Sequence, residues 1–187
     1  MSRSALFIAA LVCLSAALSL VMSTGIPERA RNISLLPGEL PVAPEIGAIA
    51  PSFELPSLTG NRLSLVQLRG NPVIINFWAT WCEPCQVEMP VLQGLYEQHG
   101  EQGLHVLAIN VGETAIQDWA MALHLTFDIA LDDRQQVAEL FQLRGMPSTY
   151  IIAPDGIITA IFYGPTTERQ LQVAIAPYLS LSYNPAP

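Results

Sequence analysis

At the centre of this sequence stands the stretch Asn76-Phe77-Trp78-Ala79-Thr80-Trp81-Cys82-Glu83-Pro84-Cys85. The run from Val73 to Trp78 that leads into it is almost wholly apolar, which is typical of a short strand buried on both faces. Thiols three residues apart can close a small disulfide ring across the first turn of a helix, where unpaired backbone N–H groups favour a thiolate. The stretch therefore predicts a buried strand leading into a helix whose first turn carries a redox-capable dithiol.

The composition sets the class of the protein. The chain has 187 residues, of which 51% are hydrophobic, so it can form one domain with a substantial core. It carries 8 Lys and Arg residues against 16 Asp and Glu residues, and its formal net charge is -8. No basic patch or stripe interrupts this acidic balance, so no nucleic-acid partner is expected.

The N-terminal run from Ala5 to Met22 is uncharged and almost wholly apolar, and it follows a short start that contains Arg3. As a helix it would measure about 27 Å, close to the ~30 Å of a bilayer core. It is longer than the apolar core of a usual cleaved signal, and no clear cleavage site follows it. We therefore expect residues 1–22 to be an uncleaved signal-anchor helix with its N-terminus inside; a cleaved export signal is the alternative. Cys13, within this run, is expected to face lipid or a neighbouring helix.

The rest of the chain divides into a tether, a domain and a tail. Residues 23–47 contain four prolines and no lasting period of 2 or 3.6, which predicts a semi-extended tether. We expect the folded domain at residues 48–180 and a short tail at residues 181–187. Apolar runs alternating with segments of helical spacing indicate an α/β domain with a mixed sheet. The expected elements are a hairpin between residues 51 and 68, strands at 73–78, 104–111 and 127–131, helices at 82–98, 114–123 and 134–143, a hairpin at 149–162 and a final helix after 167.

Three of the expected helices begin with a capping pair, in which side chains at the helix start bind backbone N–H groups. The pairs are Thr114 with Gln117, Asp132 with Gln135, and Thr167 with Gln170. We therefore expect these pairs to mark where the helices start.

A Cys-x-x-Cys pair also occurs in zinc sites, haem attachment sites and peroxidase centres. A zinc site needs two further ligands, but there is no second cysteine pair, and His99, His105 and His124 are scattered along the chain. A haem attachment motif needs histidine where Gln86 stands. A peroxidatic cysteine at position 82 would require a hydroxyl residue three positions earlier, where this chain has Ala79. A redox dithiol is what remains, and no metal or cofactor is expected.

The chain resembles the thioredoxin superfamily in three places: Trp81-Cys82-Glu83-Pro84-Cys85, Pro90 in the same helix, and Gly145-Met146-Pro147-Ser148-Thr149. Within that superfamily it is similar to the membrane-tethered TlpA/ResA branch and to the related CcmG (DsbE) proteins of cytochrome c maturation. The residues that carry this closer likeness are Ala50-Pro51-x-Phe53-x-Leu55, Leu58-x-Gly60, Ile75-Asn76-Phe77-Trp78-Ala79-x-Trp81-Cys82 and Glu88-x-Pro90. The resemblance implies a thioredoxin-like three-layer fold, in which helices flank a central mixed sheet.

The resemblance also implies roles at the dithiol, where the two cysteines would form a redox-active disulfide. Cys82 would be the exposed nucleophile whose thiolate attacks a substrate disulfide, and the more buried Cys85 would resolve the mixed disulfide. Pro147 would be a cis-proline beside the dithiol, and the backbone of Met146 would pair with an extended substrate segment. Trp81 is expected against the dithiol, as an apolar contact for partner proteins.

Two glutamates near the dithiol are expected to tune its chemistry. Thioredoxin has a buried Asp in the strand before its motif, whereas this chain has Asn76, which cannot act as a general base. Glu88 lies one helical turn past Cys85, and the TlpA/ResA branch carries a glutamate there, so we expect Glu88 to be the proton relay. A solvated helix charge is the alternative. Glu83 lies beside Cys82, where its charge opposes a thiolate, and it is expected to favour reduction over disulfide donation.

These residues together predict a membrane-anchored thiol-disulfide oxidoreductase with its catalytic domain outside the cytoplasm. Its partners would be protein disulfides, with apocytochrome c as the class the resemblance suggests, and the membrane through residues 5–22. Because that compartment is oxidising, a transmembrane thiol carrier of the CcdA/DsbD kind is the implied electron donor. Two other functions stay open: a general reductase of periplasmic or cell-surface disulfides, and a non-catalytic binding module on the same fold.

Overall fold

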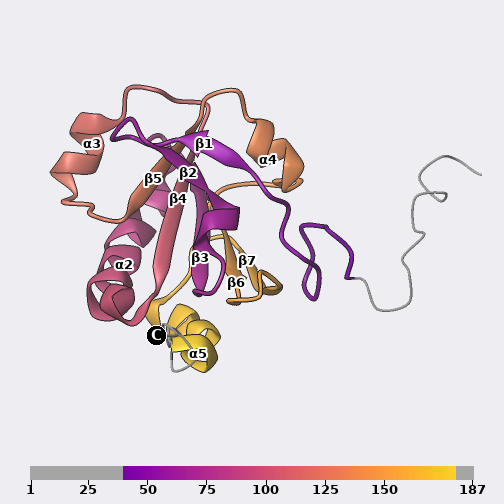
Figure 1. The fold of residues 1–187 in the computed structure, drawn as a ribbon. Helices are drawn as coiled ribbons and strands as arrows, with labels where there is room; N and C mark the ends of the chain where they lie inside the picture. Colours follow the sequence, from indigo (N-terminus) through magenta and orange to yellow (C-terminus); the bar gives the residue numbers. More distant parts are fainter. Residues whose placement is uncertain (1–39, 180–187) are drawn as a thin grey trace, which may run out of the picture. The chain divides into compact units, whose positions relative to one another are not determined.

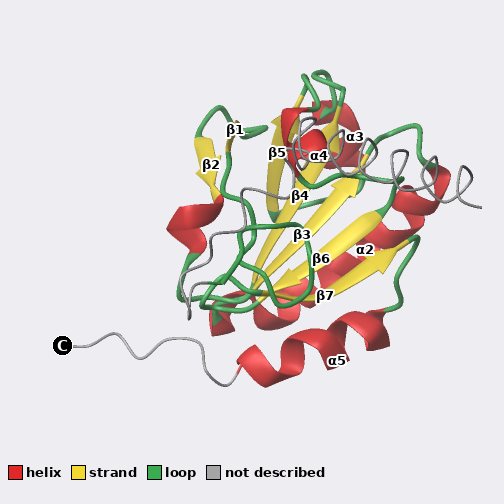
Figure 2. Cartoon of the chain, turned by 90° about the vertical axis from the view of Figure 1, so that its right-hand side faces the viewer, coloured by secondary structure: helices red, strands yellow, loops and turns green. Residues whose placement is uncertain are grey.

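A computed structural model describes residues 40–179, and five of their strands form one central sheet (Figure 1). The strands are β3 (Val73–Trp78), β4 (His105–Val111), β5 (Asp128–Asp132), β6 (Ser148–Ile152) and β7 (Ile158–Tyr163). They lie in the order β5-β4-β3-β6-β7, which can be followed in Figure 2. Strands β3, β4 and β5 are parallel, whereas β6 is antiparallel to β3 and β7 is antiparallel to β6. The expected α/β domain with a mixed sheet is confirmed.

Some expected segments lie outside the described residues: the signal-anchor helix at residues 1–22 with Cys13, most of the tether, and the tail at residues 181–187. Within residues 40–179, no helix is both long enough and apolar enough to cross a membrane. The anchor therefore stays a prediction from the sequence.

Strand β3 is the central strand of the sheet, and all six of its residues are buried, as the apolar run predicted. It pairs on one side with β4 and on the other with β6, so that Asn76 lies opposite Ala108 and Thr149. Because both edges of β3 are hydrogen-bonded, its position is fixed by two neighbours at once. Whatever follows β3 in the chain is therefore held at one defined end of the sheet.

Helices and a hairpin cover the two faces of the sheet and complete the three layers. One face carries α2 (Glu83–His99), α3 (Gln117–Ala122) and α5 (Glu168–Leu179), whose apolar residues share a core with Ile74 and Trp78. The other face carries the hairpin of β1 (Glu54–Pro56) and β2 (Arg62–Ser64), the short helix η2 (Leu65–Leu68), and α4 (Gln136–Leu140). A further short helix, η3 (Gly100–Gln102), follows α2. The side chains of β3 alternate between the two cores, which explains its continuous burial.

An aromatic cluster fixes the end of α4 on the sheet. The ring centroids of Phe77, Phe141 and Tyr150 are 5.1–5.8 Å apart in pairs. Buried aromatic pairs at this spacing contribute about 0.5–1.5 kcal/mol beyond the burial of their surface. Since Phe141 directly follows α4, this cluster holds the start of the loop from α4 to β6 against the sheet.

The capping pairs have three different outcomes. At α5 the pair is confirmed: the Gln170 side chain accepts from the Thr167 N–H at 2.9 Å, and the Thr167 hydroxyl accepts from the Gln170 N–H at 3.4 Å. At α4, Asp132 does bind the helix start, but it accepts from the N–H groups of Val137 and Ala138, at 3.0 and 2.8 Å. The helix is accordingly shorter than residues 134–143, and Gln135 takes the N-cap position itself without a capping hydrogen bond from its side chain.

The expected cap at Thr114 and Gln117 is wrong. Helix α3 begins at Gln117 after Ile116, and no side chain caps it. Ile116 is only 1% exposed. Burial of this side chain therefore sets the start of the helix, two residues too late for Thr114 and Gln117 to occupy the two positions of a capping box.

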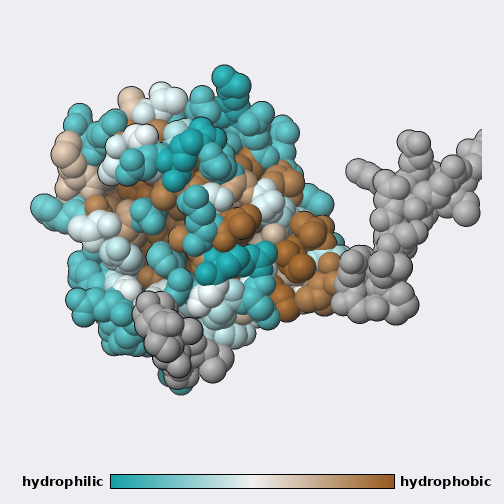
Figure 3. Space-filling view, in the orientation of Figure 1, coloured by the Kyte–Doolittle hydropathy of each residue, from teal (hydrophilic) through white to brown (hydrophobic). Residues whose placement is uncertain are grey.

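The last residues of the predicted tether belong to the folded domain. Gly47 donates its N–H to the carbonyl of Ile158 at 2.8 Å, and Ala43 donates to Ile49 at 3.1 Å. Residues 40–47 therefore lie against the start of β7. Apolar side chains show at the surface in Figure 3, and the exposed ones in this segment are Leu40, Val42 and Ile46.

Candidate active site

The dithiol lies at the junction between β3 and α2. Cys82 is the N-cap residue of α2 and Cys85 lies in its first turn, and a disulfide joins them with their Cα atoms 5.2 Å apart. Cys85 is fully buried, whereas Cys82 keeps 6% of its surface exposed. The expected order of exposure is right, but the expectation of an exposed Cys82 is wrong for this oxidised form. Its side chain packs in the same core as Trp78 and Ala79.

The predicted cis-proline is present, since the peptide bond between Met146 and Pro147 is cis. Pro147 directly precedes β6, which runs antiparallel to β3 and pairs Ser148 with Phe77. The start of β6 therefore lies beside the end of β3, from which the chain leads to Cys82. This topology brings the two halves of the predicted site to the same end of the sheet.

A groove of about 430 Å³ joins these two halves. Trp81, which precedes Cys82, and Met146, which precedes Pro147, both line it, and Trp81 is 70% exposed. The other lining residues named here were not predicted from the sequence; they come from α4 and the loop after it, and they include Glu139, Gln142 and Arg144. Only the fold shows that Glu139, Gln142 and Arg144 line this groove, because no motif includes them.

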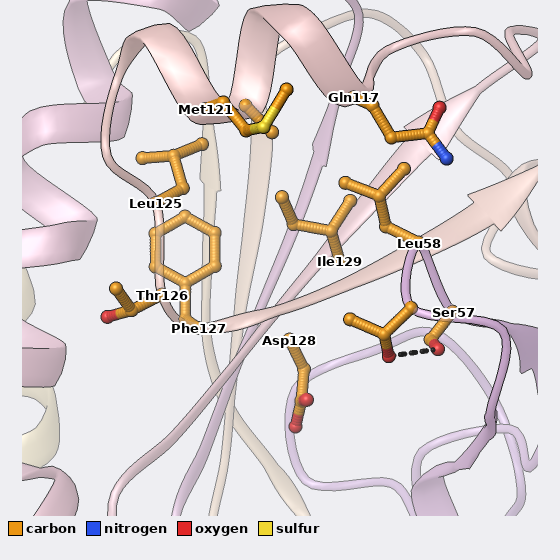
Figure 4. Close-up of a pocket in the computed structure, with 11 residues that line it drawn as sticks. Ser57, Leu58, Gln117, Met121, Leu125, Thr126, Phe127, Asp128 and Ile129 are labelled. Atoms are coloured by element: carbon orange, nitrogen blue, oxygen red, sulfur yellow. Dashed lines mark hydrogen bonds between the residues drawn. The ribbon is translucent and has the colours of Figure 1, made fainter.

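A second hollow, of about 420 Å³, lies away from the dithiol (Figure 4). Met121 of α3, Phe127 and Ile129 of the β5 region and Leu58 from the turn between β1 and β2 point into it. None of the residues predicted to act in the chemistry lines this hollow. It is therefore separate from the active site.

The carboxyl group of Glu88 lies inside the domain, with only 1% of the residue exposed. It accepts hydrogen bonds from the Asn76 amide at 2.9 Å, from the Thr149 hydroxyl at 3.4 Å, and from both the N–H, at 3.0 Å, and the hydroxyl of Thr166. Burial raises the pKa of Glu88 above its ordinary value, although these hydrogen bonds pull it in the opposite direction. Glu88 is thus a buried acid one turn past Cys85, and not the solvated helix charge that was the alternative.

The structure brings Asn76 and Glu88 together, so the strand position and the helix position belong to one polar cluster. Thr149 and Thr166 complete this cluster and were not predicted from the sequence. The available signal for Thr166 was its place immediately before the capping pair at Thr167, where the chain enters α5. Glu83 lies where expected, exposed in the first turn of α2 beside Cys82.

Known proteins share both the sequence and the fold of this chain. The profile of the AhpC/TSA family matches residues 46–161. The thiol-disulfide oxidoreductase ResA of Bacillus subtilis is 35% identical over 127 residues, which cover 67% of this chain and 71% of that protein. ResA of Geobacillus kaustophilus is 36% identical over 129 residues, which cover 68% of this chain and 74% of that protein.

Solved structures with the same fold include two with at least 26% sequence identity. A protein from Chlorobium tepidum assigned as thiol:disulfide interchange protein DsbE superposes with a TM-score of 0.68 and 27% identity, covering 72% of this chain and 98% of that chain. StoA from Bacillus subtilis superposes with a TM-score of 0.59 and 26% identity, covering 66% of this chain and 96% of that chain.

The substitution Glu88→Gln is expected to remove a pH dependence of stability. The pKa of Glu88 is raised in the folded protein and returns towards its ordinary value of 4.5 on unfolding. Between those values the folded protein binds more protons than the unfolded protein, so the free energy of unfolding falls as the pH rises through this window. One group contributes at most about 1.4 kcal/mol per pH unit. Urea denaturation of the oxidised protein, from about pH 4 to about pH 8, measures the slope.

Glu101→Gln is the matched control, because Glu101 is exposed and the same charge is removed. The buried side-chain amide that Glu88→Gln introduces can be accommodated, since Asn76 Oδ1 has no hydrogen-bond partner among the described residues and can accept once the amide turns. An unchanged slope in Glu88→Gln would contradict the raised pKa.

Proposed function

This chain belongs to the AhpC/TSA family and is a thiol-disulfide oxidoreductase of the ResA and DsbE type, and from this premise we propose that it reduces the disulfide of apocytochrome c outside the cytoplasm. The observation that carries the proposal is the groove beside the dithiol, lined by Trp81 before Cys82 and by Met146 before Pro147. Its volume of about 430 Å³ suits a few side chains of an extended peptide. A haem-attachment segment, which carries two cysteines close together, can lie there with its disulfide at Cys82.

The reaction passes two electrons from the protein to the substrate. The reduced protein begins with both cysteines as thiols, and the Cys82 thiolate attacks one sulfur of the substrate disulfide, whose other sulfur leaves as a thiolate and takes up a proton. The Cys85 thiolate then attacks Cys82, which releases the second substrate thiol and forms the Cys82–Cys85 disulfide. That disulfide is the state of the dithiol in the structure, so the structure corresponds to the protein after one round of reduction.

Glu88 is the group that takes the proton from Cys85 in the second step. It lies in the same helix, one turn further on, and it is buried as Cys85 is. Burial brings its pKa closer to neutral pH, where a carboxylate is a more effective base than at its ordinary pKa. Asn76 donates to the carboxylate and cannot itself accept the proton, so Glu88 in α2 is the base.

Glu83 favours reduction by raising the pKa of the Cys82 thiol, because its carboxylate stands next to the thiolate in the chain. Ionisation of Cys82 to a thiolate stabilises the reduced dithiol. A raised pKa of Cys82 weakens this stabilisation, so the reduced dithiol passes its electrons to a substrate more readily. Ultraviolet titration of the reduced protein should show a lower pKa for Cys82 in Glu83→Gln than in the unchanged protein. Asp118→Asn, on the exposed surface of α3, is the control for loss of one charge. No fall in pKa would remove this role.

The substrate can be identified by trapping the mixed disulfide. In cells that produce the protein, Cys85→Ser should accumulate complexes linked through Cys82, because the resolving thiol is gone. Mass spectrometry of these complexes should find cytochrome c precursors, and the double variant Cys82→Ser, Cys85→Ser should find none. If the trapped complexes contain many exported proteins but no cytochrome c precursor, the protein is instead a general reductase of extracytoplasmic disulfides. As a check of the reaction itself, Cys82→Ser should abolish the reduction of insulin.

The site of action follows from the N-terminal segment. The apolar run at residues 5–22 anchors the protein in the membrane, with the catalytic domain on the extracytoplasmic side, and a transmembrane thiol carrier of the CcdA/DsbD kind restores the dithiol. The full-length chain should stay in the membrane fraction after an alkaline carbonate wash, with the mass of the uncleaved protein. A chain without residues 1–22 should be released. A membrane-extracted protein whose mass lacks the first 22 residues would contradict the anchor.

A further inference from the structure

A second glutamate, Glu113, contacts the turn that leads to the nucleophile. Its carboxylate accepts hydrogen bonds from the N–H of Thr80 at 2.7 Å, from the hydroxyl of Thr80, and from the amide of Asn110 at 2.9 Å. Partial burial raises the pKa of Glu113, but these hydrogen bonds outweigh it and hold the pKa below the ordinary value. Glu113 is therefore an anion with both oxygens engaged.

Thr80 is the residue that these contacts fix. It lies two positions before Cys82, in a turn closed by a hydrogen bond from the Cys82 N–H to the Ala79 carbonyl at 3.2 Å. The carbonyl of Thr80 accepts from the Gln86 side chain at 2.6 Å. All the polar groups of Thr80 are thus bound by side chains from two other places, the end of β4 and the first turns of α2.

The sheet explains why Glu113 can reach this turn. Strands β3 and β4 are parallel and pair Trp78 with Asn110, so their carboxyl ends lie side by side. Gly112, with φ of +79°, then turns the chain in a conformation that other residues rarely adopt. The carboxylate of Glu113 is thereby presented across to Thr80 at the same end of the sheet.

We infer that Glu113 is a positioning residue for thiol-disulfide exchange, which holds the turn at residues 79–82 so that Cys82 stays at the N-cap of α2. This placement matters because the thiolate depends on the N–H groups at the start of that helix. One of them is missing, since Pro84 in the first turn has none. Loss of the contact lets Cys82 move away from the remaining donors. The inference uses the activity of the family and does not depend on which protein is the substrate.

Three substitutions separate the reach of this side chain from its charge. Glu113→Ala removes both, Glu113→Asp keeps the charge but is one methylene too short, and Glu113→Gln keeps the length with one acceptor oxygen. With its oxygen in the place of Oε2, the last variant still accepts from the Thr80 N–H and from Asn110, and its amide can donate to the Thr80 hydroxyl. A small misplacement of a reacting group can cost up to ~100-fold in rate. We therefore expect kcat/KM for insulin reduction to fall about tenfold or more in the Glu113→Ala and Glu113→Asp variants, and less than about threefold in Glu113→Gln.

The sign of the change in the pKa of the Cys82 thiol decides between positioning and charge. Removing an anion that acts only through its field would lower this pKa in both the Ala and the Gln variants. Loss of positioning raises it in the Ala variant, because the thiolate loses its donors. Ultraviolet titration of the reduced proteins measures it, with Asp118→Ala as the control for charge alone. A fall in the Ala variant, or a kcat/KM within about twofold of the unchanged protein, would overturn the inference.

The other partner in the contact allows the same test if the Ala variant does not fold. Thr80→Val removes the hydroxyl donor at nearly constant volume, and Thr80→Ser keeps it. Thr80→Val should lower kcat/KM about threefold or more and raise the pKa of Cys82, and Thr80→Ser should do neither. Equal values for the two variants would overturn the inference as well. Urea denaturation of each oxidised variant confirms that it is folded before its rate is used.

Discussion

The active site depends on one constraint: β3 is hydrogen-bonded along both edges, in parallel to β4 and antiparallel to β6. Because of this pairing, the end of β3, the end of β4 and the start of β6 all meet at one end of the sheet. The first leads to Cys82, the second to Glu113, and the third follows Pro147. Residues that are far apart in the chain are thus brought to a common site by strand pairing, and side-chain contacts such as that of Glu113 with Thr80 then act within it. A shift of one register position would break this arrangement and turn the apolar side chains of β3 to the wrong faces.

Two buried asparagines on these strands each donate a hydrogen bond to a glutamate near the dithiol. Asn76 donates its amide to Glu88 below the dithiol, and Asn110 donates to Glu113 beside it, both at 2.9 Å. Each leaves its carbonyl oxygen without a partner among the described residues, which is costly inside a protein. An aspartate in either place would set two carboxylates against each other at hydrogen-bond distance. Asparagine instead supplies a donor, so that Glu88 can exchange a proton and Glu113 stays a charged acceptor.

The parts of the fold that follow from short-range patterns could be predicted from the sequence. The apolar run predicted β3, the three-residue spacing of the cysteines predicted the dithiol, and Pro154-Asp155-Gly156 predicted the hairpin of β6 and β7. The cis-proline came from the resemblance to thioredoxins and from no local pattern. The environment of Glu88 was out of reach, because its partners Thr149 and Thr166 lie 61 and 78 residues away. The start of α3 was missed because the burial of one isoleucine outweighs an available cap.

Three glutamates surround the dithiol, and their degree of burial separates their roles. Two unit charges 4 Å apart interact by about 1 kcal/mol in water and about 4 kcal/mol at an effective dielectric constant of 20, so the same carboxylate matters more where water is excluded. Glu88 is buried, and its raised pKa suits it to proton transfer. Glu113 is partly buried, and its lowered pKa keeps it a permanent acceptor. Glu83 is exposed, so solvent and salt screen its field. The two glutamates that accept from buried asparagines are therefore the ones whose protonation state the fold determines, whereas the glutamate inside the motif can act on Cys82 only through a screened field.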